Sequence, residues 1–255
     1  LSGCAGAQSP AVEHVPTAPR MLGGAQVEYV VWTPPDFRED ERLPLVLFLH
    51  GGGDDARTFE RYGLADRMTA AASAGEIPRF VMVFPQGDDG FWMNWYDGTR
   101  RYEDWIVDDL LPEVSERWHT RACPEDCHVM GVSMGGNGAV RFALHRPERF
   151  ASVTTLSGPI FDTQRMSEFT DNRLFAAFVP MHRIFGPTEP ASRLWPEDVY
   201  RQWESPEDVG MPVFLAWGTN DRPGLDTSNE HFARHLVEHE IPHHVVVYEG
   251  NHSWR

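Results

Sequence analysis

The stretch "HVMGVSMGGNGAV", residues 128–140, joins an apolar run to a helix-like segment through one serine, Ser133. Glycines stand on both sides of this serine, at positions 131, 135, 136 and 138. A strand that ends at Val132 and a helix that starts directly after the serine require a very tight turn. Side chains beside the serine would collide with the neighbouring strand and helix, so glycine is needed there. The pattern therefore predicts a strand–turn–helix unit that presents the serine hydroxyl above the end of a sheet.

The segments on either side of this unit alternate between apolar runs and helix-like stretches. Most of the runs are continuously apolar, which is typical of parallel strands buried on both faces. Strand–helix alternation predicts a doubly wound α/β fold, with a mostly parallel central sheet covered by helices on both faces. We expect an antiparallel edge hairpin at 27–35. The expected strands are 43–50, 79–85, 128–133, 150–158, 211–218 and 243–250, and the expected helices are 58–74, 102–118, 134–146 and 227–240.

Length and composition suit one large domain. The chain has 255 residues, of which 41% are hydrophobic, and we predict a domain over 20–255 that follows a flexible tether over 1–19. Residues 159–210 form a long, Pro-punctuated, aromatic insertion with no clear strand, and long connections of this kind are often functional.

The net charge of −16 argues against nucleic acid as a partner because phosphates would be repelled.

The residues around the central serine fit nucleophilic catalysis. Gly131-Val132-Ser133-Met134-Gly135 matches the nucleophile-elbow pattern, in which the start of a helix favours developing negative charge. A serine nucleophile needs a base, and the base needs an orienting acid. Asp221 and His252 each follow an expected strand and so lie at the same edge of the sheet as Ser133. We predict Ser133 as nucleophile, His252 as base and Asp221 as acid.

Other acidic residues and histidines fit these roles less well. Asp226 and Asp208 are weaker candidates for the acid because neither directly follows a strand. His231, His235 and His239 recur at four-residue spacing on one expected helix; we favour a solvated helix face over a metal stripe. The sequence therefore predicts a site without metal or cofactor.

A second glycine-rich segment, "LHGGGDD" at 49–55, follows the first buried strand. Glycines there let the backbone approach a reacting carbonyl group. One N–H, from Gly52 or Gly53, would pair with the N–H of Met134 to form an oxyanion hole. The alternative is that these glycines form only a flexible loop. This alternative is less well supported because the same chain contains a nucleophile elbow and a terminal histidine.

Cys123 and Cys127 lie four positions apart in "CPEDC". A disulfide between them would close a small loop and indicate an oxidising compartment. Two free thiols, or a metal half-site with the adjacent His128, remain as alternatives. We favour the disulfide.

The first residues, "LSGC", resemble a bacterial lipobox, in which small residues precede a cysteine that becomes lipidated. A small-residue and Pro-rich stretch follows Cys4, as expected for a flexible tether. This interpretation predicts lipidation of Cys4, membrane anchoring through that lipid, and a cell-envelope or extracellular location. An accidental match to the short motif is the alternative.

From about Val27 onwards the chain resembles the esterase D-like branch of the α/β-hydrolases. The motifs that carry the resemblance are "HGGGDD", "FWMNWYDGTRRYEDWIVDDLLPEV", "GVSMGGNGAVRFALHRPERF", "GTND" and "GNHSW". This branch includes tributyrin esterases, S-formylglutathione hydrolases, feruloyl and acetyl-xylan esterases, and mycolyltransferases. The resemblance implies an α/β-hydrolase fold and the same three catalytic residues. It also implies that residues around Asn94 and Trp95 lie near the site, and we add His50, at the end of a strand, as a third substrate-binding candidate.

The chain departs from this family in two places. Members usually continue past the catalytic histidine into a final helix, whereas this sequence stops at Arg255, so we expect that helix to be absent. The insertion at 159–210 matches no family pattern. Its aromatic residues, with Phe91, Trp92, Trp95 and Tyr96, are expected to line a cleft with flat walls that suits stacking.

These features together predict a serine carboxylic-ester hydrolase that works through an acyl-enzyme. The expected substrates are short-chain, aromatic or sugar-borne acyl esters, carried by small molecules or carbohydrates. Two alternatives use the same sequence features. One is acyl transfer to an alcohol by the same triad, and the other is a catalytically inactive binding protein of the cell envelope.

Overall fold

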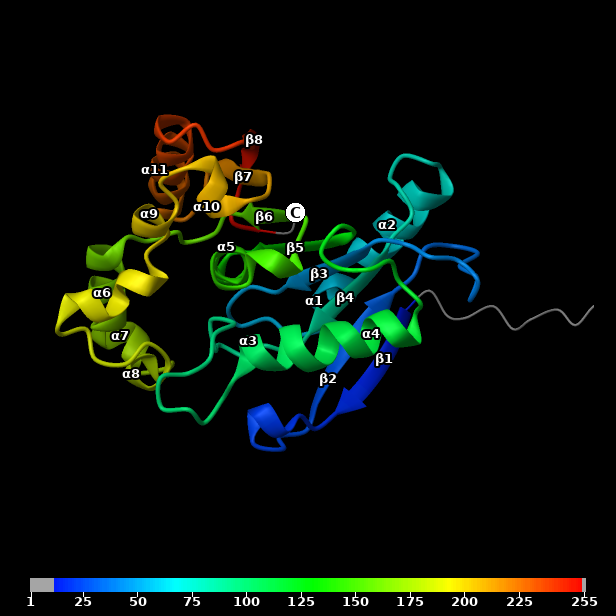
Figure 1. Ribbon diagram of the computed structural model, residues 1–255, viewed down its shortest axis with the longest axis horizontal. Coiled ribbons are helices and arrows are strands. Elements are labelled where there is room, and N and C mark those ends of the chain that lie inside the picture. Colours follow the sequence, from blue (N-terminus) through cyan, green and yellow to red (C-terminus); the bar gives the residue numbers. More distant parts are fainter. Residues whose placement is uncertain (1–11, 254–255) are drawn as a thin grey trace, which may run out of the picture.

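The computed structural model describes residues 12–253 and is built around one eight-stranded sheet (Figure 1). The strands lie side by side in the order β1-β2-β4-β3-β5-β6-β7-β8. Their bounds are β1 Val12–Thr17, β2 Val27–Trp32, β3 Leu45–Leu49, β4 Val81–Pro85, β5 Cys127–Val132, β6 Ser152–Leu156, β7 Val213–Asn220 and β8 His243–Asn251.

Six strands of this sheet run parallel. β4, β3, β5, β6, β7 and β8 pair in parallel in that order, while β1 and β2 add an antiparallel edge. The predicted mostly parallel α/β sheet is thus confirmed, and all six predicted strands are present. Because parallel strands end at one edge, the loops after β3, β5, β7 and β8 meet there.

The amino-terminal edge differs from the predicted tether. Residues 12–17, which we assigned to the tether, form β1 and pair along their length with β2. β1 is therefore the partner of the predicted edge strand at 27–35. Residues 1–11 of the predicted tether, with Cys4, lie outside the described residues. Residues 254 and 255 also lie outside the described residues, so the expectation that the final helix is absent stays a prediction.

Helices cover both faces of the sheet. α1 and α2 pack on a core face that includes Trp32, Phe48 and Phe84, while α4, α5 and α11 contribute buried residues to the larger core on the other face. Helix bounds are α1 Thr58–Arg61, α2 Leu64–Ser73, α3 Tyr102–Asp104, α4 Leu111–Arg117, α5 Met134–His145 and α11 Leu225–Glu238.

Two predicted helices are less regular than expected. The helix at 58–74 is divided into α1 and α2 at Gly63, whose φ of 71° no regular helix adopts. The helix at 102–118 stays continuous, but a π-helical turn, η2 Trp105–Leu110, joins α3 to α4.

The insertion 159–210 consists of short helices, and the structure shows no strand in it. These helices gather at one end of the molecule, away from β1 and β2 (Figure 1). The longest, α6, has eight residues. Their bounds are α6 Thr163–Thr170, α7 Arg173–Ala176, α8 Met181–Ile184, η4 Ala191–Glu197, α9 Val199–Gln202 and α10 Pro206–Val209.

A partly buried charge network joins the insertion to the main domain. Glu197 forms ion pairs with Arg141 and His145 of α5, and His145 also contacts Glu103 at 2.9 Å. Burial alone would lower the pKa of His145, but the hydrogen bonds to Glu103 and Glu197 outweigh it and raise the pKa to about 9.

His231 and His235 of α11, with His239 at its C-cap, do not form a solvated face, so this prediction was wrong. His235 is buried and hydrogen-bonds to the carbonyl of Trp203 at 2.8 Å. His239 reaches the carbonyl of Glu204, and His231 stacks on Tyr200. The histidines dock α11 against the end of the insertion.

Cys123 and Cys127 are joined in a disulfide, with their Cα atoms 5.0 Å apart. Cys127 opens β5, so the bridge closes a small loop just before that strand. Among residues 12–253, no helix has the length and apolar character needed to cross a membrane.

Candidate active site

Ser133 occupies the tight turn between β5 and α5. Its φ of 55° and ψ of −121° are unusual for a residue with a side chain, and such conformations cost about 1–3 kcal/mol unless neighbouring contacts hold them. The Ser133 N–H donates to the carbonyl of Leu156 at 2.8 Å, and its own carbonyl accepts from Asn137 at 3.1 Å. Hydrogen bonds on both sides thus hold the strained turn.

Two glycines make this turn sterically feasible. A Cβ on Gly131 would collide with the carbonyl of Gly135, and a Cβ on Gly135 would collide with the carbonyl of Leu49 at the end of β3. The start of α5 therefore packs directly against the backbone of two strands. This is the collision that the sequence pattern predicted.

The structure brings the three predicted catalytic residues together. Nε2 of His252 lies 2.9 Å from Oγ of Ser133, and Nδ1 of His252 lies 2.7 Å from Oδ1 of Asp221. The Asp221 side chain is fully buried, and its second oxygen, Oδ2, has no hydrogen-bond partner among the described residues. The two weaker candidates for the acid make other contacts: Asp208 lies within α10 and accepts from the hydroxyl of Ser205, and Asp226 accepts from the N–H of Thr227.

The two predicted oxyanion donors of the glycine loop differ in availability. The N–H of Gly53 donates to Oδ1 of Asp89 at 2.7 Å, so it is already engaged. The N–H of Gly52 makes no hydrogen bond to any residue in 12–253. The N–H of Met134 lies in the first turn of α5, where a helix offers no acceptor. Of the predicted donors, Gly52 and Met134 fit, and Gly53 does not.

His50 is a structural residue, contrary to its predicted substrate contact. Its ring is buried, with Nδ1 at 2.8 Å from the carbonyl of Gly51 and Nε2 accepting from the N–H of Gly87 at 3.0 Å. Both ring nitrogens are thereby satisfied, and burial lowers the pKa of His50. The His50 carbonyl also accepts from the indole of Trp92 at 3.1 Å. His50 thus ties the glycine loop to the 87–92 loop.

Asn94 and Trp95, the other predicted substrate contacts, are not among the residues that line the cavity at Ser133. Oδ1 of Asn94 accepts from the N–H of Asp104 at 3.2 Å. The ring of Trp95 packs against Tyr102 and the guanidinium of Arg183. These contacts join the 94–101 loop to α3 and the insertion.

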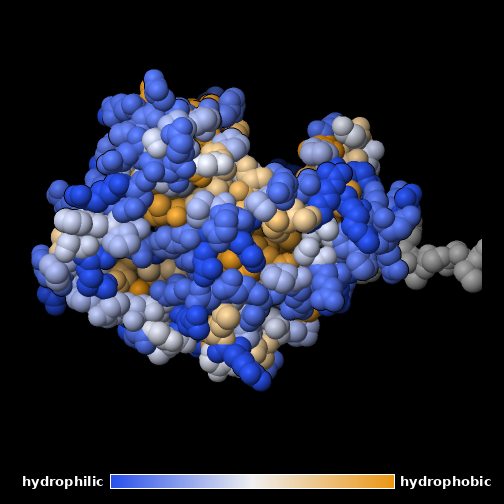
Figure 2. Space-filling model, viewed as in Figure 1, coloured by the Kyte–Doolittle hydropathy of each residue, from blue (hydrophilic) through white to orange (hydrophobic). Residues whose placement is uncertain are grey.

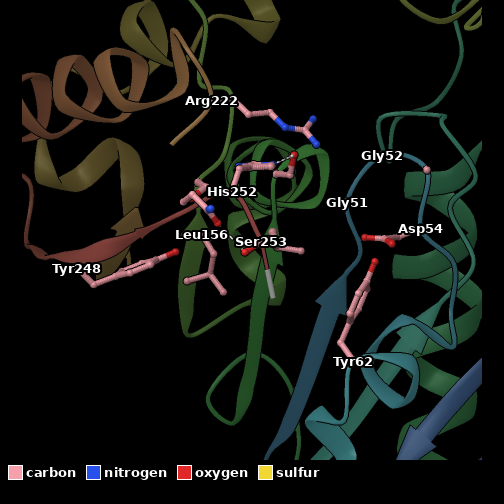
Figure 3. A pocket seen from close by; sticks show the side chains of 14 residues that line it. Gly51, Gly52, Asp54, Tyr62, Leu156, Arg222, Tyr248, His252 and Ser253 are labelled. Carbon is pink, nitrogen blue, oxygen red and sulfur yellow. Dashed lines mark hydrogen bonds between the residues drawn. The ribbon is translucent and has the colours of Figure 1, made fainter. Parts of the chain in front are cut away.

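A cavity of about 500 Å³ opens at Ser133, and none of the insertion's residues line it. Figure 3 shows Arg222, Tyr248 and His252 on one side of it and Gly52, Asp54 and Tyr62 on the other. Of these residues, His252 and Gly52 were predicted from the sequence, whereas Arg222, Tyr248, Asp54 and Tyr62 were not. The lining residues are Gly51, Gly52, Gly53, Asp54, Tyr62, Val132, Ser133, Leu156, Ser157, Arg222, Tyr248, Asn251, His252 and Ser253.

Four aromatic residues of the insertion pack together with Phe91, and none of the insertion's aromatic residues lines the cavity at Ser133, so the predicted cleft is not formed there. Phe91 contacts Phe169 and Phe185 with ring centroids 5.6 and 5.1 Å apart, and Phe169 contacts Phe161 and Phe175. The rings fasten the insertion to the 87–101 loop. Figure 2 shows a largely hydrophilic face with small hydrophobic patches, several of them near its middle.

The arrangement suits proton-coupled attack by Ser133. An imidazole between a hydroxyl and a buried carboxylate can accept the hydroxyl proton while the carboxylate orients the ring. Among residues 12–253, no group of three or more His, Cys, Asp or Glu side chains is arranged to hold a metal ion.

Comparison with known sequences gives matches to esterases. Residues 22–255 match the model of the family Esterase, described as "Putative esterase". Esterase Rv1288 of Mycobacterium tuberculosis is 35% identical over 136 residues, which cover 51% of this chain and 28% of that protein. A bifunctional protein of Xylanibacter ruminicola, an endo-1,4-beta-xylanase/feruloyl esterase, is 26% identical over 134 residues, covering 51% of this chain and 18% of that protein. The matched part is thus a minor share of each relative.

Solved structures share the fold over nearly the whole chain. The fluorophosphonate-binding serine hydrolase FphF of Staphylococcus aureus superimposes with a TM-score of 0.77 at 21% identity, covering 96% of this chain and 92% of that one. A ferulic acid esterase gives a TM-score of 0.75 at 21% identity, with 95% and 91% covered. At this identity the likeness establishes the α/β-hydrolase fold.

Proposed function

The chain belongs to the Esterase family, and we propose that it is a serine carboxylic-ester hydrolase with Ser133 as nucleophile. The observation that carries the proposal is the continuous hydrogen-bonded row of Ser133, His252 and Asp221, with distances of 2.9 and 2.7 Å. The family's esterase relatives support the same reaction class.

The first half of the reaction forms an acyl-enzyme. Oγ of Ser133 attacks the ester carbonyl while Nε2 of His252 takes the hydroxyl proton. The carbonyl oxygen becomes an oxyanion, which the N–H groups of Gly52 and Met134 stabilise. As the C–O bond breaks, His252 returns the proton to the leaving alcohol, and the acyl group stays on Ser133.

The second half releases the acid. Water gives a proton to His252 and attacks the acyl carbonyl, and the same two N–H groups hold the second oxyanion. The proton then returns from His252 to Oγ of Ser133 as the acid leaves. The Asp221 carboxylate orients the His252 ring and stabilises the imidazolium that forms in each half.

The cavity favours short or compact acyl groups. Its volume of about 500 Å³ lies within the usual range for small-molecule sites. No apolar helix of the insertion lines it, so nothing among residues 12–253 offers the broad apolar cover that a long acyl chain needs. Tyr62 and Tyr248 in its walls suit an aromatic or sugar-borne group by stacking.

Acyl transfer to an alcohol would use the same residues, and the character of the cavity favours hydrolysis. Arg222, Asn251 and Ser253 are exposed and line the opening, so water reaches the acyl-enzyme. A transferase would need walls that exclude water from this intermediate.

The disulfide also supports a proposal on location. Bridges such as Cys123–Cys127 persist in oxidising compartments and are rare in the cytosol. We propose that the protein acts in the cell envelope or outside the cell, with Cys4 as the lipid attachment point.

Turnover of p-nitrophenyl butyrate by the wild type and by Ser133→Ala tests the proposed activity. We expect the substitution to lower kcat by up to about a millionfold, as losses of such nucleophiles do, while the circular dichroism spectrum is unchanged. Equal turnover by the two proteins would overturn the assignment of Ser133.

A further inference from the structure

Arg222 brings an uncommitted positive charge into the cavity. It is the only arginine that lines the cavity among residues 12–253, and the chain contains no lysine. Its guanidinium makes no hydrogen bond or ion pair with another residue in 12–253, whereas its backbone N–H donates to Oδ1 of Asp221 at 2.7 Å. Both the His252 ring and this backbone N–H use Oδ1 of Asp221, and the Arg222 guanidinium contacts neither oxygen of that carboxylate. The guanidinium is left free to bind a ligand.

The opposite wall carries a negative charge. A methyl group on Gly51 would lie 3.4 Å from Oδ2 of Asp54 and 3.3 Å from Cβ of Ser133. The Asp54 carboxylate therefore borders the approach to the serine on the side of the glycine loop. The cavity has its cation on the β7–β8 side and its carboxylate on the β3 side (Figure 3), so it favours one orientation of a charged ligand.

The reaction fixes which part of the ester lies near Arg222. His252 must deliver its proton to the leaving oxygen, so the alcohol fragment lies on the His252 side of the scissile bond. Arg222 follows directly after the residue that orients His252, and Figure 3 draws its side chain beside that ring. The acyl fragment lies on the other side of the scissile bond from the alcohol fragment.

We propose that Arg222 binds an anionic group, a carboxylate or a phosphate, on the alcohol fragment of the ester. This inference rests on the proposed esterase activity and narrows its substrate class. A protein with a net charge of −16 repels anions over most of its surface. A local guanidinium, which pairs with planar oxyanions through two parallel hydrogen bonds, offsets that repulsion at one point only.

The test compares two acetate esters that differ in one charge. 3-Acetoxybenzoate carries a carboxylate on its leaving group, and methyl 3-acetoxybenzoate is the neutral counterpart. The measured quantity is the ratio of their kcat/KM values, anionic over neutral. We expect Arg222→Gln to lower this ratio about five- to tenfold, the range for a partly exposed charge pair. Arg222→Lys should lower the ratio less than Arg222→Gln does, because lysine keeps the positive charge but lacks the paired N–H donors of the guanidinium.

Three further measurements make the result specific. Arg234→Gln, which removes an exposed arginine of α11 outside the cavity, should leave the ratio at its wild-type value. The wild-type preference should shrink in about 1 M NaCl, where charges are screened within about 3 Å. Monophenyl succinate, which carries its carboxylate on the acyl side, should show no Arg222-dependent gain over phenyl acetate.

The outcomes distinguish a failure of the proposed anion site from a failure of the proposed esterase activity. If Ser133-dependent cleavage of the neutral ester is present and Arg222→Gln leaves the ratio unchanged, the anion site is wrong and the esterase stands. The anion site is equally wrong if Arg234→Gln lowers the ratio as much as Arg222→Gln does. If neither ester is cleaved in a Ser133-dependent way, the proposed function itself fails.

Discussion

The charge network that docks the insertion should make stability depend on pH. The pKa of His145 is raised from 6.5 to about 9 by Glu103 and Glu197 against the effect of burial. A group whose pKa rises on folding binds its proton more tightly in the native state. Its contribution is complete below about pH 6.5 and is lost as the pH rises through about 9.

The size of the contribution follows from the same shift. Each tenfold change in proton affinity is worth about 1.4 kcal/mol, so His145 contributes about 3 kcal/mol when it is fully charged. His145 and Glu197 share one interaction, and their contributions are not summed. About 3 kcal/mol is a large part of the stability of a typical domain.

Urea unfolding of the wild type and His145→Gln between about pH 6 and pH 10 measures this contribution. We expect the variant to be about 3 kcal/mol less stable near pH 6, and the difference to fall towards zero above pH 9. His244→Gln, which removes an exposed imidazole from β8, is the matched control and should show no such trend. A stability difference between wild type and His145→Gln that is constant across this range would refute the reasoning.

Three other predictions concern the site, the substrate and the disulfide. Asp221→Asn should lower kcat by about 10⁴-fold with little change in KM, and near-normal turnover of p-nitrophenyl butyrate by this variant would remove Asp221 as the acid. Across p-nitrophenyl esters from acetate to palmitate, kcat/KM should peak at a short chain because the cavity holds about 500 Å³, and a maximum at laurate or longer would contradict this. Cys123 and Cys127 should react with iodoacetamide only after reduction, and full alkylation of the native, unreduced protein would exclude the bridge.

The parts of the fold that local patterns determine were predictable. Apolar runs identified the six parallel strands, because strands inside such a sheet are covered on both faces, although β8, at the edge of the sheet, is largely exposed. The glycines at 131 and 135 identified the turn at Ser133, because a Cβ at either position meets backbone. Asp221 and His252 followed from strand ends alone, since parallel strands end at one edge.

The parts that tertiary contacts determine were not predictable. Residues 12–17 alternate weakly and contain a proline, and only pairing with β2 makes them a strand. His50 lies at the end of a strand, as a substrate-binding residue would, but both of its ring nitrogens form hydrogen bonds with the backbone of Gly51 and Gly87. Arg222 and Tyr62 lie in loops, and hydrophobic periodicity does not predict the path of a loop. Their place in the walls of the cavity could therefore be identified only from the structure.

The central claim is that Ser133 is a nucleophile activated by His252, and covalent labelling tests it most directly. The purified protein is treated with a fluorophosphonate, digested, and mapped by mass spectrometry. We expect one adduct per chain, on the peptide that contains Ser133, and a much slower rate of labelling in His252→Ala. An adduct on another residue, or labelling of Ser133→Ala at the wild-type rate, would contradict this claim.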